Sequence, residues 1–161
     1  MYQSNGREEL VELKDTPVME AGAPEPLVID AYDGCVLAYR MRGDDDRGGP
    51  IALVTFKGVS AVYSGGPNDE ALQGHPLWVR GLRSYTAYEV LNSAWREALR
   101  EMNRVHDRHS DARFDRLRHF IWTFHDTTFE CLAHSYGCST LVETHVHGTK
   151  SLLKAAYGLE Q

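Results

Sequence analysis

Alternation of apolar and polar residues predicts an antiparallel β-hairpin early in the chain. Residues 27–32 and 35–41 are rich in strand-forming side chains and flank an Asp-Gly dipeptide. This dipeptide tolerates the positive φ values of a type I′ turn, which joins antiparallel strands. Such a turn places Tyr32 opposite Cys35, and both faces of the hairpin are largely apolar. We therefore expect other parts of the protein to cover both faces.

The middle of the chain predicts two short strands and the loops around them. The strands are expected at residues 51–56 and 59–63, where apolar residues are bounded by glycine and proline. Residues 43–50 carry three adjacent aspartates, which indicate a solvated loop because Ca²⁺-binding loops need alternating ligands. Residues 64–70 contain glycines but lack the Lys-Ser/Thr ending of a phosphate-binding loop, so we expect a turn.

From residue 92 the apolar period lengthens to three or four residues, which predicts a helix to about residue 105. The recurring apolar positions are Leu91, Trp95, Leu99 and Met102. Either Asn92 or Ser93 can accept hydrogen bonds from the first free amides as the N-cap. A shorter helix is expected to begin at Asp111 and to bury Phe114 and Leu117.

Arginines recur every four residues along the main predicted helix, at Arg96, Arg100, Arg104 and Arg108. Glu97 and Glu101 precede Arg100 and Arg104 by three residues, a spacing at which side chains of a helix form ion pairs. The arginines therefore indicate a solvated, salt-bridged face. An acidic protein partner is the alternative interpretation.

A second hairpin is predicted late in the chain. Residues 120–124 and 129–133 are rich in aromatic and β-forming residues and are joined by a short polar turn. The register that places Trp122 opposite Cys131 gives one wholly apolar face, which we assign to the core. The opposite face carries His119, Ile121, Thr123, His125, Thr128, Glu130, Leu132 and His134.

This mixed face is the strongest candidate for chemistry. In the expected register His125 and Glu130 are diagonal neighbours, close enough for a carboxylate to raise the basicity of an imidazole. Such a pair can act as a general acid and base near neutral pH. We expect Thr123, His119 and His134 to line the site. An aromatic side chain such as Trp78 would close it. The alternative is that His125 and Glu130 are ordinary exposed hairpin residues.

The C-terminal tail offers a second candidate site. On an extended strand Glu143, His145 and His147 would point to one side, and two imidazoles with a carboxylate suit zinc or ferrous iron. A solvated or partner-facing strand explains the same spacing. No motif in the sequence implies an organic cofactor. Cys131 faces the predicted core and Cys138 lacks an obvious activating base, so neither is favoured as a nucleophile.

The order of strands, helices and strands predicts an α+β fold, with an antiparallel, strongly curved sheet and one main helix packed on one side. A chain of 161 residues is typical of a single domain. We assign that domain to residues 26–161. Residues 1–25 are acidic and have little apolar periodicity, so we expect a loosely ordered arm.

Charge and cysteine content exclude some classes of function. The net charge of −6 argues against a nucleic-acid-binding protein, which needs a basic surface. The sequence has no apolar run long enough to span a membrane, and its first residues lead us to expect no secretory leader. Its three cysteines include no CxxC pair, which favours a reducing compartment. We therefore expect a cytoplasmic protein.

Three segments resemble a family of uncharacterised bacterial proteins. These are Gly-Gly-Pro-Asn-Asp-Glu at 65–70, Gly-His-Pro-Leu at 74–77 and Phe-His-Asp-Thr-Thr-Phe-Glu-Cys at 124–131. They occur in the family's order and span about residues 57–133 of this chain. The resemblance implies no activity, cofactor or mechanism.

The sequence thus leaves three hypotheses of function. The first is a domain that binds a small molecule and acts as an acid–base enzyme, for proton transfer or hydrolysis, through His125 and Glu130. The second is a non-catalytic immunity or regulatory module that binds a protein partner through its acidic arm or its arginines. The third is a metal-assisted enzyme that uses the clustered histidines. Self-association into a homo-oligomer is compatible with all three.

Overall fold

The computed structural model describes residues 2–32, 34–43 and 50–141 and shows an α+β fold with two antiparallel sheets. The first sheet has five strands in the order β1-β6-β7-β8-β5, and the second has four in the order β2-β3-β4-β9. The strands of the first sheet are β1 (Glu9–Glu12), β5 (Ala61–Gly65), β6 (Ala87–Leu91), β7 (Arg118–Thr123) and β8 (Thr128–Ala133). Those of the second are β2 (Leu27–Ala31), β3 (Gly34–Arg40), β4 (Ile51–Lys57) and β9 (Ser135–Leu141).

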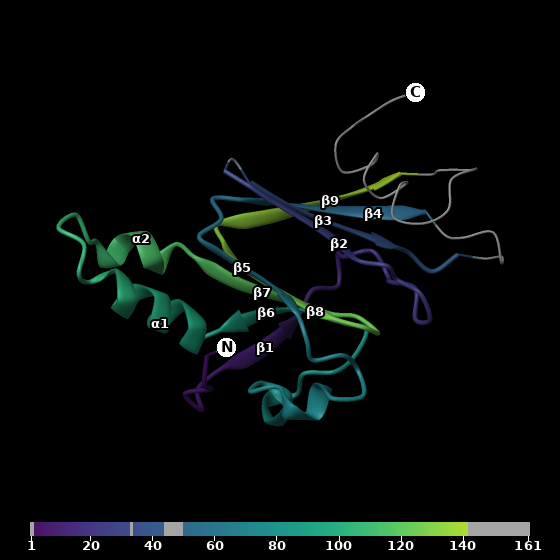
Figure 1. The fold of residues 1–161 in the computed structure, drawn as a ribbon, viewed down its shortest axis with the longest axis horizontal. Coiled ribbons are helices and arrows are strands. Elements are labelled where there is room, and N and C mark those ends of the chain that lie inside the picture. Colours follow the sequence, from purple (N-terminus) through teal and green to yellow (C-terminus); the bar gives the residue numbers. More distant parts are fainter. Residues whose placement is uncertain (1, 33, 44–49, 142–161) are drawn as a thin grey trace.

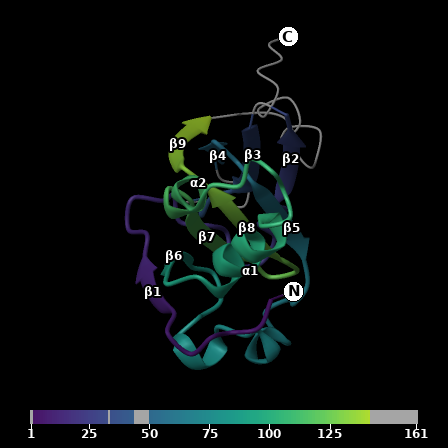
Figure 2. The same ribbon diagram turned by 90° about the vertical axis from the view of Figure 1, so that its left-hand side faces the viewer.

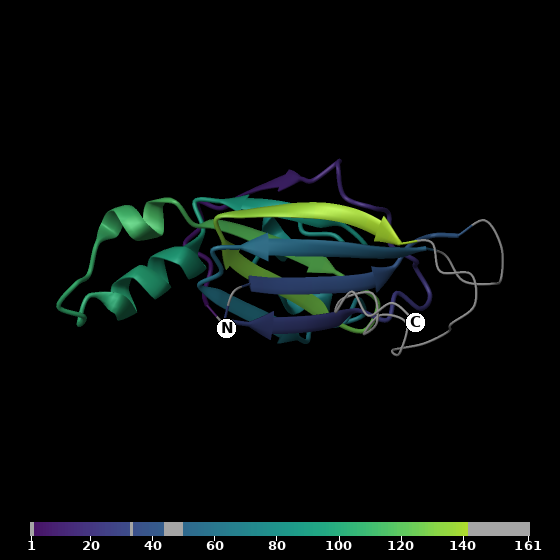
Figure 3. The ribbon, with the colours of Figure 1, turned by 90° about the horizontal axis from the view of Figure 1, so that it is seen from above.

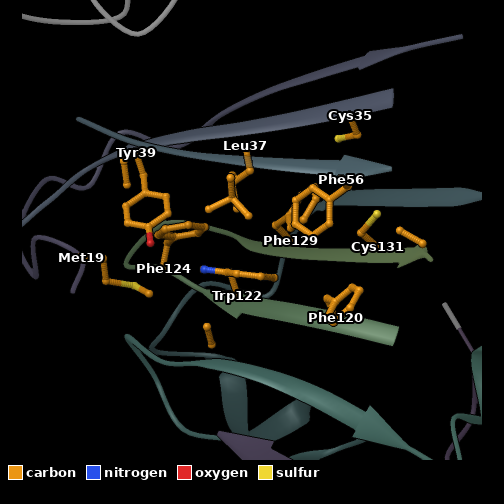
Figure 4. Close-up of a cluster of buried hydrophobic side chains, with 14 residues drawn as sticks. Met19, Cys35, Leu37, Tyr39, Phe56, Phe120, Trp122, Phe124, Phe129 and Cys131 are labelled. Carbon is orange, nitrogen blue, oxygen red and sulfur yellow. The ribbon is translucent and has the colours of Figure 1, made fainter. Parts of the chain in front are cut away.

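The two sheets pack face to face and enclose the main hydrophobic core (Figures 1 and 4). Phe56 of β4 lies with its ring centroid 5.5 Å from that of Trp122 on β7 and 5.3 Å from that of Phe129 on β8. Trp122 and Phe129 are fully buried. The aromatic face of the late hairpin therefore faces the core, as its alternating sequence predicts.

The chain passes between the sheets at one corner. β4 runs into β5 and β8 runs into β9, and the amide of His134 donates to the carbonyl of Lys57 (2.9 Å) at this corner. Gly58 has a φ of +64°, and a Cβ there would lie 2.3 Å from Nδ1 of His134, so only glycine fits this bend. The sequence predicts one strongly curved sheet, and the structure instead has two sheets joined at this corner, where two strands of one sheet continue into the other. The sequence around Gly137 favours a bend after the late hairpin, but residues 135–137 instead belong to β9.

Both hairpins differ from the expected register by two residues. In the first, Ala31 pairs with Gly34, and in the second, Thr123 pairs with Thr128. An even shift leaves every side chain on its predicted face, whereas a shift by one would invert the faces. The partners across each pair of strands are therefore corrected, while the division into core and outer faces stands.

The first 25 residues are packed against the sheets, which differs from the loosely ordered arm expected from their composition. β1 pairs with β6 through a register that includes Leu10 and Val90. Met19 is only 4% exposed and belongs to the main core. Glu8 accepts hydrogen bonds from the hydroxyl of Ser4 (2.7 Å) and the amide of Asn5 (2.8 Å), which fixes the chain ahead of β1.

The predicted helices are present as α1 (Ala94–Asn103) and α2 (Asp111–Asp115). Ser93 is the N-cap of α1, and its hydroxyl accepts from the amide of Arg96 (3.1 Å). Phe114 and Leu117 are buried as predicted. The helices lie beyond one end of the sheets rather than flat on one side (Figures 1 and 2). No helix in the described ranges is long and apolar enough to cross a membrane.

The arginines of α1 form the ion pairs expected from their spacing. Arg100 lies 3.3 Å from the carboxylate of Glu97, and Arg104 lies 2.8 Å from that of Glu101. Arg100 also contacts Asp115 of α2 (2.5 Å). These pairs fit the solvated, salt-bridged face. The three adjacent aspartates lie outside the described residues.

Candidate functional site

The outer face of the five-stranded sheet holds two clusters of polar side chains. Strands β7 and β8 direct His119, Ile121, Thr123 and Glu130 to this face, because they alternate with the aromatic residues of the core. The first residues of the chain and the segment between β5 and β6 cover the face. That segment contains two short 3₁₀ turns at Leu72–Gly74 and Trp78–Arg80. His119, Thr123 and Glu130 are consequently buried.

The first cluster is centred on the carboxylate of Glu130. One oxygen lies 2.9 Å from Nε2 of His119 and accepts from the hydroxyl of Tyr2 (2.8 Å). The other oxygen lies 3.4 Å from Nε2 of His75. The phenol ring of Tyr2 stacks on Trp95 of α1, with centroids 6.0 Å apart. We call Tyr2, His75, His119 and Glu130 the sealed cluster, because the side chains of His75 and His119 have no exposed surface and that of Glu130 is 2% exposed.

Hydrogen bonds to the Nδ1 atoms bear on where the two imidazoles carry their protons, and the bond to His75 fixes its tautomer. The amide of Leu77 donates to Nδ1 of His75 (3.2 Å), so Nε2 carries the proton and donates to Glu130. Nδ1 of His119 lies 2.9 Å from the hydroxyl of Ser93, which can donate to it. His119 can then donate to Glu130 through Nε2 in the same way. The buried carboxylate is thereby satisfied by three donors.

These donors keep Glu130 ionised despite its burial. Burial alone raises the pKa of a carboxyl group, but the hydrogen bonds from His119 and His75 outweigh this effect and lower the pKa of Glu130 to about 2. Burial and the neighbouring negative charge of Glu130 raise the pKa of Tyr2, so its hydroxyl stays protonated. The sealed cluster is therefore a satisfied polar network around a fixed negative charge.

Two imidazoles and one carboxylate also form a common set of metal ligands, but their arrangement here does not suit a metal. His75 and His119 approach different oxygens of Glu130, and Nε2 of His75 is a donor rather than a lone pair. Within the described ranges, no group of histidine, cysteine and acidic side chains has the geometry of a metal site. The predicted ligands Glu143, His145 and His147 lie outside the described residues.

The second cluster joins a loop, the start of β6 and the turn of the late hairpin. The hydroxyl of Tyr85 donates to Oδ2 of Asp69 (2.5 Å), and Nδ1 of His125 lies 2.9 Å from the same oxygen. Nδ1 also lies 2.9 Å from the Tyr85 hydroxyl. The side chain of His125 is 43% exposed and that of Asp69 is 17% exposed. We call these three residues the open cluster.

Asp69 determines the electrostatics of the open cluster. Its hydrogen bond and charge raise the pKa of His125, and the bonds from Tyr85 and His125 lower the pKa of Asp69. The hydrogen bond to Asp69 raises the pKa of Tyr85 to about 12. Oδ1 of Asp69 is buried and has no hydrogen-bond partner among the described residues. Oδ2 therefore holds both partners, whereas Oδ1 is shielded from solvent by the protein.

The backbone of Tyr85 is strained in a way that serves this arrangement. Its φ is +58°, a left-handed value that is rare for a bulky aromatic residue. Such strain concentrates at functional sites, where the surrounding structure holds a side chain in one position. Tyr85 also lines a hollow of about 300 Å³, together with residues 12–14, 16–19, 86 and 87. Tyr85 thus links the open cluster to a hollow formed largely by the N-terminal segment, whereas Asp69 and His125 are not among the lining residues.

The structure separates the two residues that the sequence pairs. Glu130 lies opposite Ile121 and belongs to the sealed cluster, whereas His125 follows the end of β7 and belongs to the open cluster. The predicted diagonal contact is therefore wrong, because the register is shifted by two residues and His125 lies in the turn. The carboxylate partner of His125 is Asp69 instead.

The other predicted site residues have different surroundings. Thr123 is buried and donates to the carbonyl of Arg83 (2.7 Å), so it holds the segment between β5 and β6 against the sheet. Trp78 packs under the guanidinium of Arg83, which lies 4.9 Å from its ring centroid. His134 is exposed at the corner beside Gly58. His119 lines the sealed cluster. None of the four contacts His125 by a hydrogen bond in the described part of the chain.

Four residues of the two clusters were not predicted: Tyr2, Asp69, His75 and Tyr85. Asp69 and His75 do occur in the segments that carry the family resemblance, at 65–70 and 74–77. Tyr2 and Tyr85 carry no pattern that distinguishes them from the other tyrosines of the chain.

Comparisons with known proteins do not add to this picture. No family model matches the chain, no curated protein matches it, and no solved structure matches its fold. Its function must therefore be inferred from the geometry of the two clusters.

Proposed function

We propose that this protein is a small-molecule-binding domain with an acid–base site formed by Asp69, Tyr85 and His125. The observation that carries the proposal is the shared oxygen Oδ2 of Asp69, which contacts both the Tyr85 hydroxyl and Nδ1 of His125. A carboxylate on Nδ1 fixes the tautomer of an imidazole and leaves Nε2 as a base. Nε2 of His125 lies 3.9 Å from the carboxylate of Asp126, too far for a hydrogen bond.

Each residue has a separate role in this proposal. His125 takes a proton from a substrate or a water molecule through Nε2 and returns it to the leaving group or product. Asp69 orients the imidazole and stabilises its positive charge. Tyr85 keeps its proton, because its pKa is about 12, and holds Oδ2 of Asp69 in place. The reaction class is proton transfer or hydrolysis without an organic cofactor.

Exposure also favours the open cluster over the sealed one. A general base must reach the reacting atom, and His125 is the imidazole of the two clusters whose side chain is accessible. The hollow lined by Tyr85 offers a place for a small molecule next to the tyrosine that contacts His125 and Asp69. We propose a cytoplasmic location for this activity, since Cys35 and Cys131 are buried as free thiols.

An activated-ester assay tests the proposal without knowledge of the natural substrate. The initial rate of p-nitrophenyl acetate hydrolysis would be compared for wild type, His125→Ala, Asp69→Asn and Tyr85→Phe. We expect losses of roughly 10²-fold for His125→Ala and smaller losses for the other two variants. His106→Ala is the matched control, because His106 is exposed, follows α1 and forms no hydrogen bond with the open cluster.

The same variants allow a second readout that needs no turnover. Diethyl pyrocarbonate modifies unprotonated imidazoles, and mass spectrometry locates the modified residue. We expect His125 to react and its pH profile to move to lower pH in Asp69→Asn. If His125→Ala hydrolyses the ester as fast as His106→Ala, and the pH profile of His125 modification is the same in wild type and Asp69→Asn, the proposal is wrong.

A further inference from the structure

The edges of the two sheets differ in how well they are protected against pairing with another strand. Sheet edges commonly carry charges or prolines that prevent such pairing. The edge strand β1 contains Glu9 and Glu12, and β5 is followed by Pro67. The edge strand β2 contains Asp30 and follows Pro26.

The fourth edge strand, β9, has neither a charge nor a proline within it; in the sequence Glu143 follows two residues after its end, as Pro67 does after β5. Its sequence is Ser-Tyr-Gly-Cys-Ser-Thr-Leu, with no charge and no proline over seven residues. It pairs with β4 on one side, and no strand in the described ranges pairs with its other side. Most of its residues are exposed. In Figure 3 this strand is the yellow-green ribbon at the margin of its sheet.

The hydrogen bonds of neighbouring strands show which groups of β9 face outward. The amide of Arg40 donates to Pro24, and its carbonyl accepts from Glu20, so both groups point away from β4. Backbone groups alternate in direction along an antiparallel strand. The registers of β3 with β4 and of β4 with β9 then direct the amides and carbonyls of Tyr136, Cys138 and Thr140 outward.

We propose that β9 pairs with β9 of a second copy of this chain, antiparallel and about a two-fold axis at Cys138. In this register Tyr136 lies opposite Thr140 of the second copy, and Cys138 lies opposite its own counterpart. The three outward-facing residues thereby exchange hydrogen bonds with the same three residues of the partner. A single uncharged strand is thus complementary to itself, as a two-fold interface requires.

Pairing also covers an exposed apolar side chain at the end of β9. Leu141 is 38% exposed, and it lies opposite Ile51 of β4, which is buried. The joined four-stranded sheets of two copies form one continuous sheet of eight strands. An interface of one strand per copy is small, so we expect a dissociation constant on the order of micromolar.

Proline substitution tests the edge directly. Thr140→Pro removes an outward amide that does not bond to β4. Because the interface is two-fold symmetric, each copy loses this hydrogen bond to its partner, so the dimer should dissociate. Asp30→Pro is the matched control, because the same alternation directs the amide of Asp30 outward from the edge of β2. Sedimentation equilibrium at about 100 µM, well above a micromolar dissociation constant, would report the mass. Circular dichroism melting would confirm that both variants fold.

The exposed thiol gives an independent test of the register. Cys138 is exposed, whereas Cys35 and Cys131 are buried. Opposed Cα atoms in an antiparallel pair lie about 5.5 Å apart, within reach of a disulfide. Mild oxidation with diamide should therefore give a covalent dimer of wild type but not of Cys138→Ser, which should still form the non-covalent dimer.

Three results would overturn the proposal. One is a wild-type protein that sediments as a monomer at about 100 µM. Another is a dimer that Thr140→Pro leaves intact or that Asp30→Pro dissociates. The third is a dimer in which Cys138 fails to cross-link, because that would place the two strands in another register.

Discussion

The sealed and open clusters use the same kinds of side chain in opposite surroundings. Each combines a carboxylate with imidazole and phenol groups at hydrogen-bond distance. Glu130 is covered on every side and receives donors on both oxygens, whereas Asp69 leaves one oxygen unpaired beside a half-exposed imidazole. The comparison shows that residue type alone does not assign a role. A satisfied carboxylate among buried partners stabilises the fold, and one that holds an accessible imidazole can support chemistry.

The sealed cluster also joins distant parts of the chain. Tyr2 comes from the N-terminal segment, His75 from the loop that covers the sheet, and His119 and Glu130 from neighbouring strands. All of them meet at one carboxylate. Substitutions here should therefore affect stability strongly, and substitutions in the open cluster should affect chemistry with little loss of stability.

The largest expected effect is that of Glu130→Gln on stability. The substitution removes the charge and replaces one acceptor by an amide donor, which leaves buried donors without partners. We expect a loss of about 3 kcal/mol in the free energy of unfolding, measured by urea denaturation. The matched control is Glu89→Gln on the same sheet, where an accessible ion pair with Arg118 should contribute less than about 1 kcal/mol. Equal losses in the two variants would show that Glu130 is not a structural centre.

A related effect is expected in acid. Folding lowers the pKa of Glu130 from 4.5 to about 2, so between these values the unfolded chain binds more protons than the native protein. The contribution of Glu130 is therefore fully present above pH 4.5 and is lost as the pH falls toward 2. The gap between the two pKa values corresponds to about 3 kcal/mol.

The measurement is urea denaturation at several pH values between 2 and 6, for wild type and Glu130→Gln. The difference between the two proteins removes the contributions of the other carboxylates. We expect this difference to shrink as the pH falls. A difference that stays constant with pH would contradict the lowered pKa of Glu130.

A smaller effect is expected for Tyr2→Phe, which keeps the stacking on Trp95 and removes only the hydroxyl donor. We expect a loss of about 1 kcal/mol in the free energy of unfolding and faster proteolysis of the N-terminal segment. Tyr63→Phe is a suitable control, because the hydroxyl of Tyr63 donates to the exposed carbonyl of Gly66. If Tyr63→Phe costs as much as Tyr2→Phe, the N-terminal segment does not depend on the sealed cluster.

Much of the architecture could be predicted from the sequence, because burial imposes a visible period. The alternation around Trp122 identified the core face of the late hairpin, and the spacing from Trp95 identified α1. The registers could not be predicted within two residues, because an even shift leaves the alternation unchanged. The strand β1 escaped notice because four residues with two glutamates at a sheet edge resemble a solvated segment.

The site could be predicted only in part, for a physical reason. His125 and Glu130 lie on the predicted hairpin, but their partners come from segments far away in the chain: Asp69 lies 56 residues before His125, and Tyr2 lies 128 residues before Glu130. No periodicity links positions that meet only in the folded protein. The strained backbone of Tyr85 also follows from tertiary packing rather than from a glycine or a turn motif.

The smallest effect on stability, and the sharpest on chemistry, is expected for Asp69→Asn in the open cluster. The substitution removes the negative charge that raises the pKa of His125, so this pKa should fall toward the ordinary value of 6.5. The raised pKa of His125 contributes stability below pH 6.5 that is lost as the pH rises through its folded value, and the lowered pKa of Asp69 contributes stability above pH 3.8 that is lost as the pH falls. The variant should therefore lose most stability between pH 3.8 and 6.5. A pH titration of the His125 ring protons by NMR measures this pKa.

Asp126→Asn is the control, because the carboxylate of Asp126 lies 3.9 Å from Nε2 of His125 and is mostly exposed. Asp126→Asn could instead lower the pKa of His125 as much as Asp69→Asn does. The charge that activates the imidazole would then be that of Asp126 in the hairpin turn. The contrast between the carboxylates of the sealed and open clusters would in that case not explain the chemistry of His125.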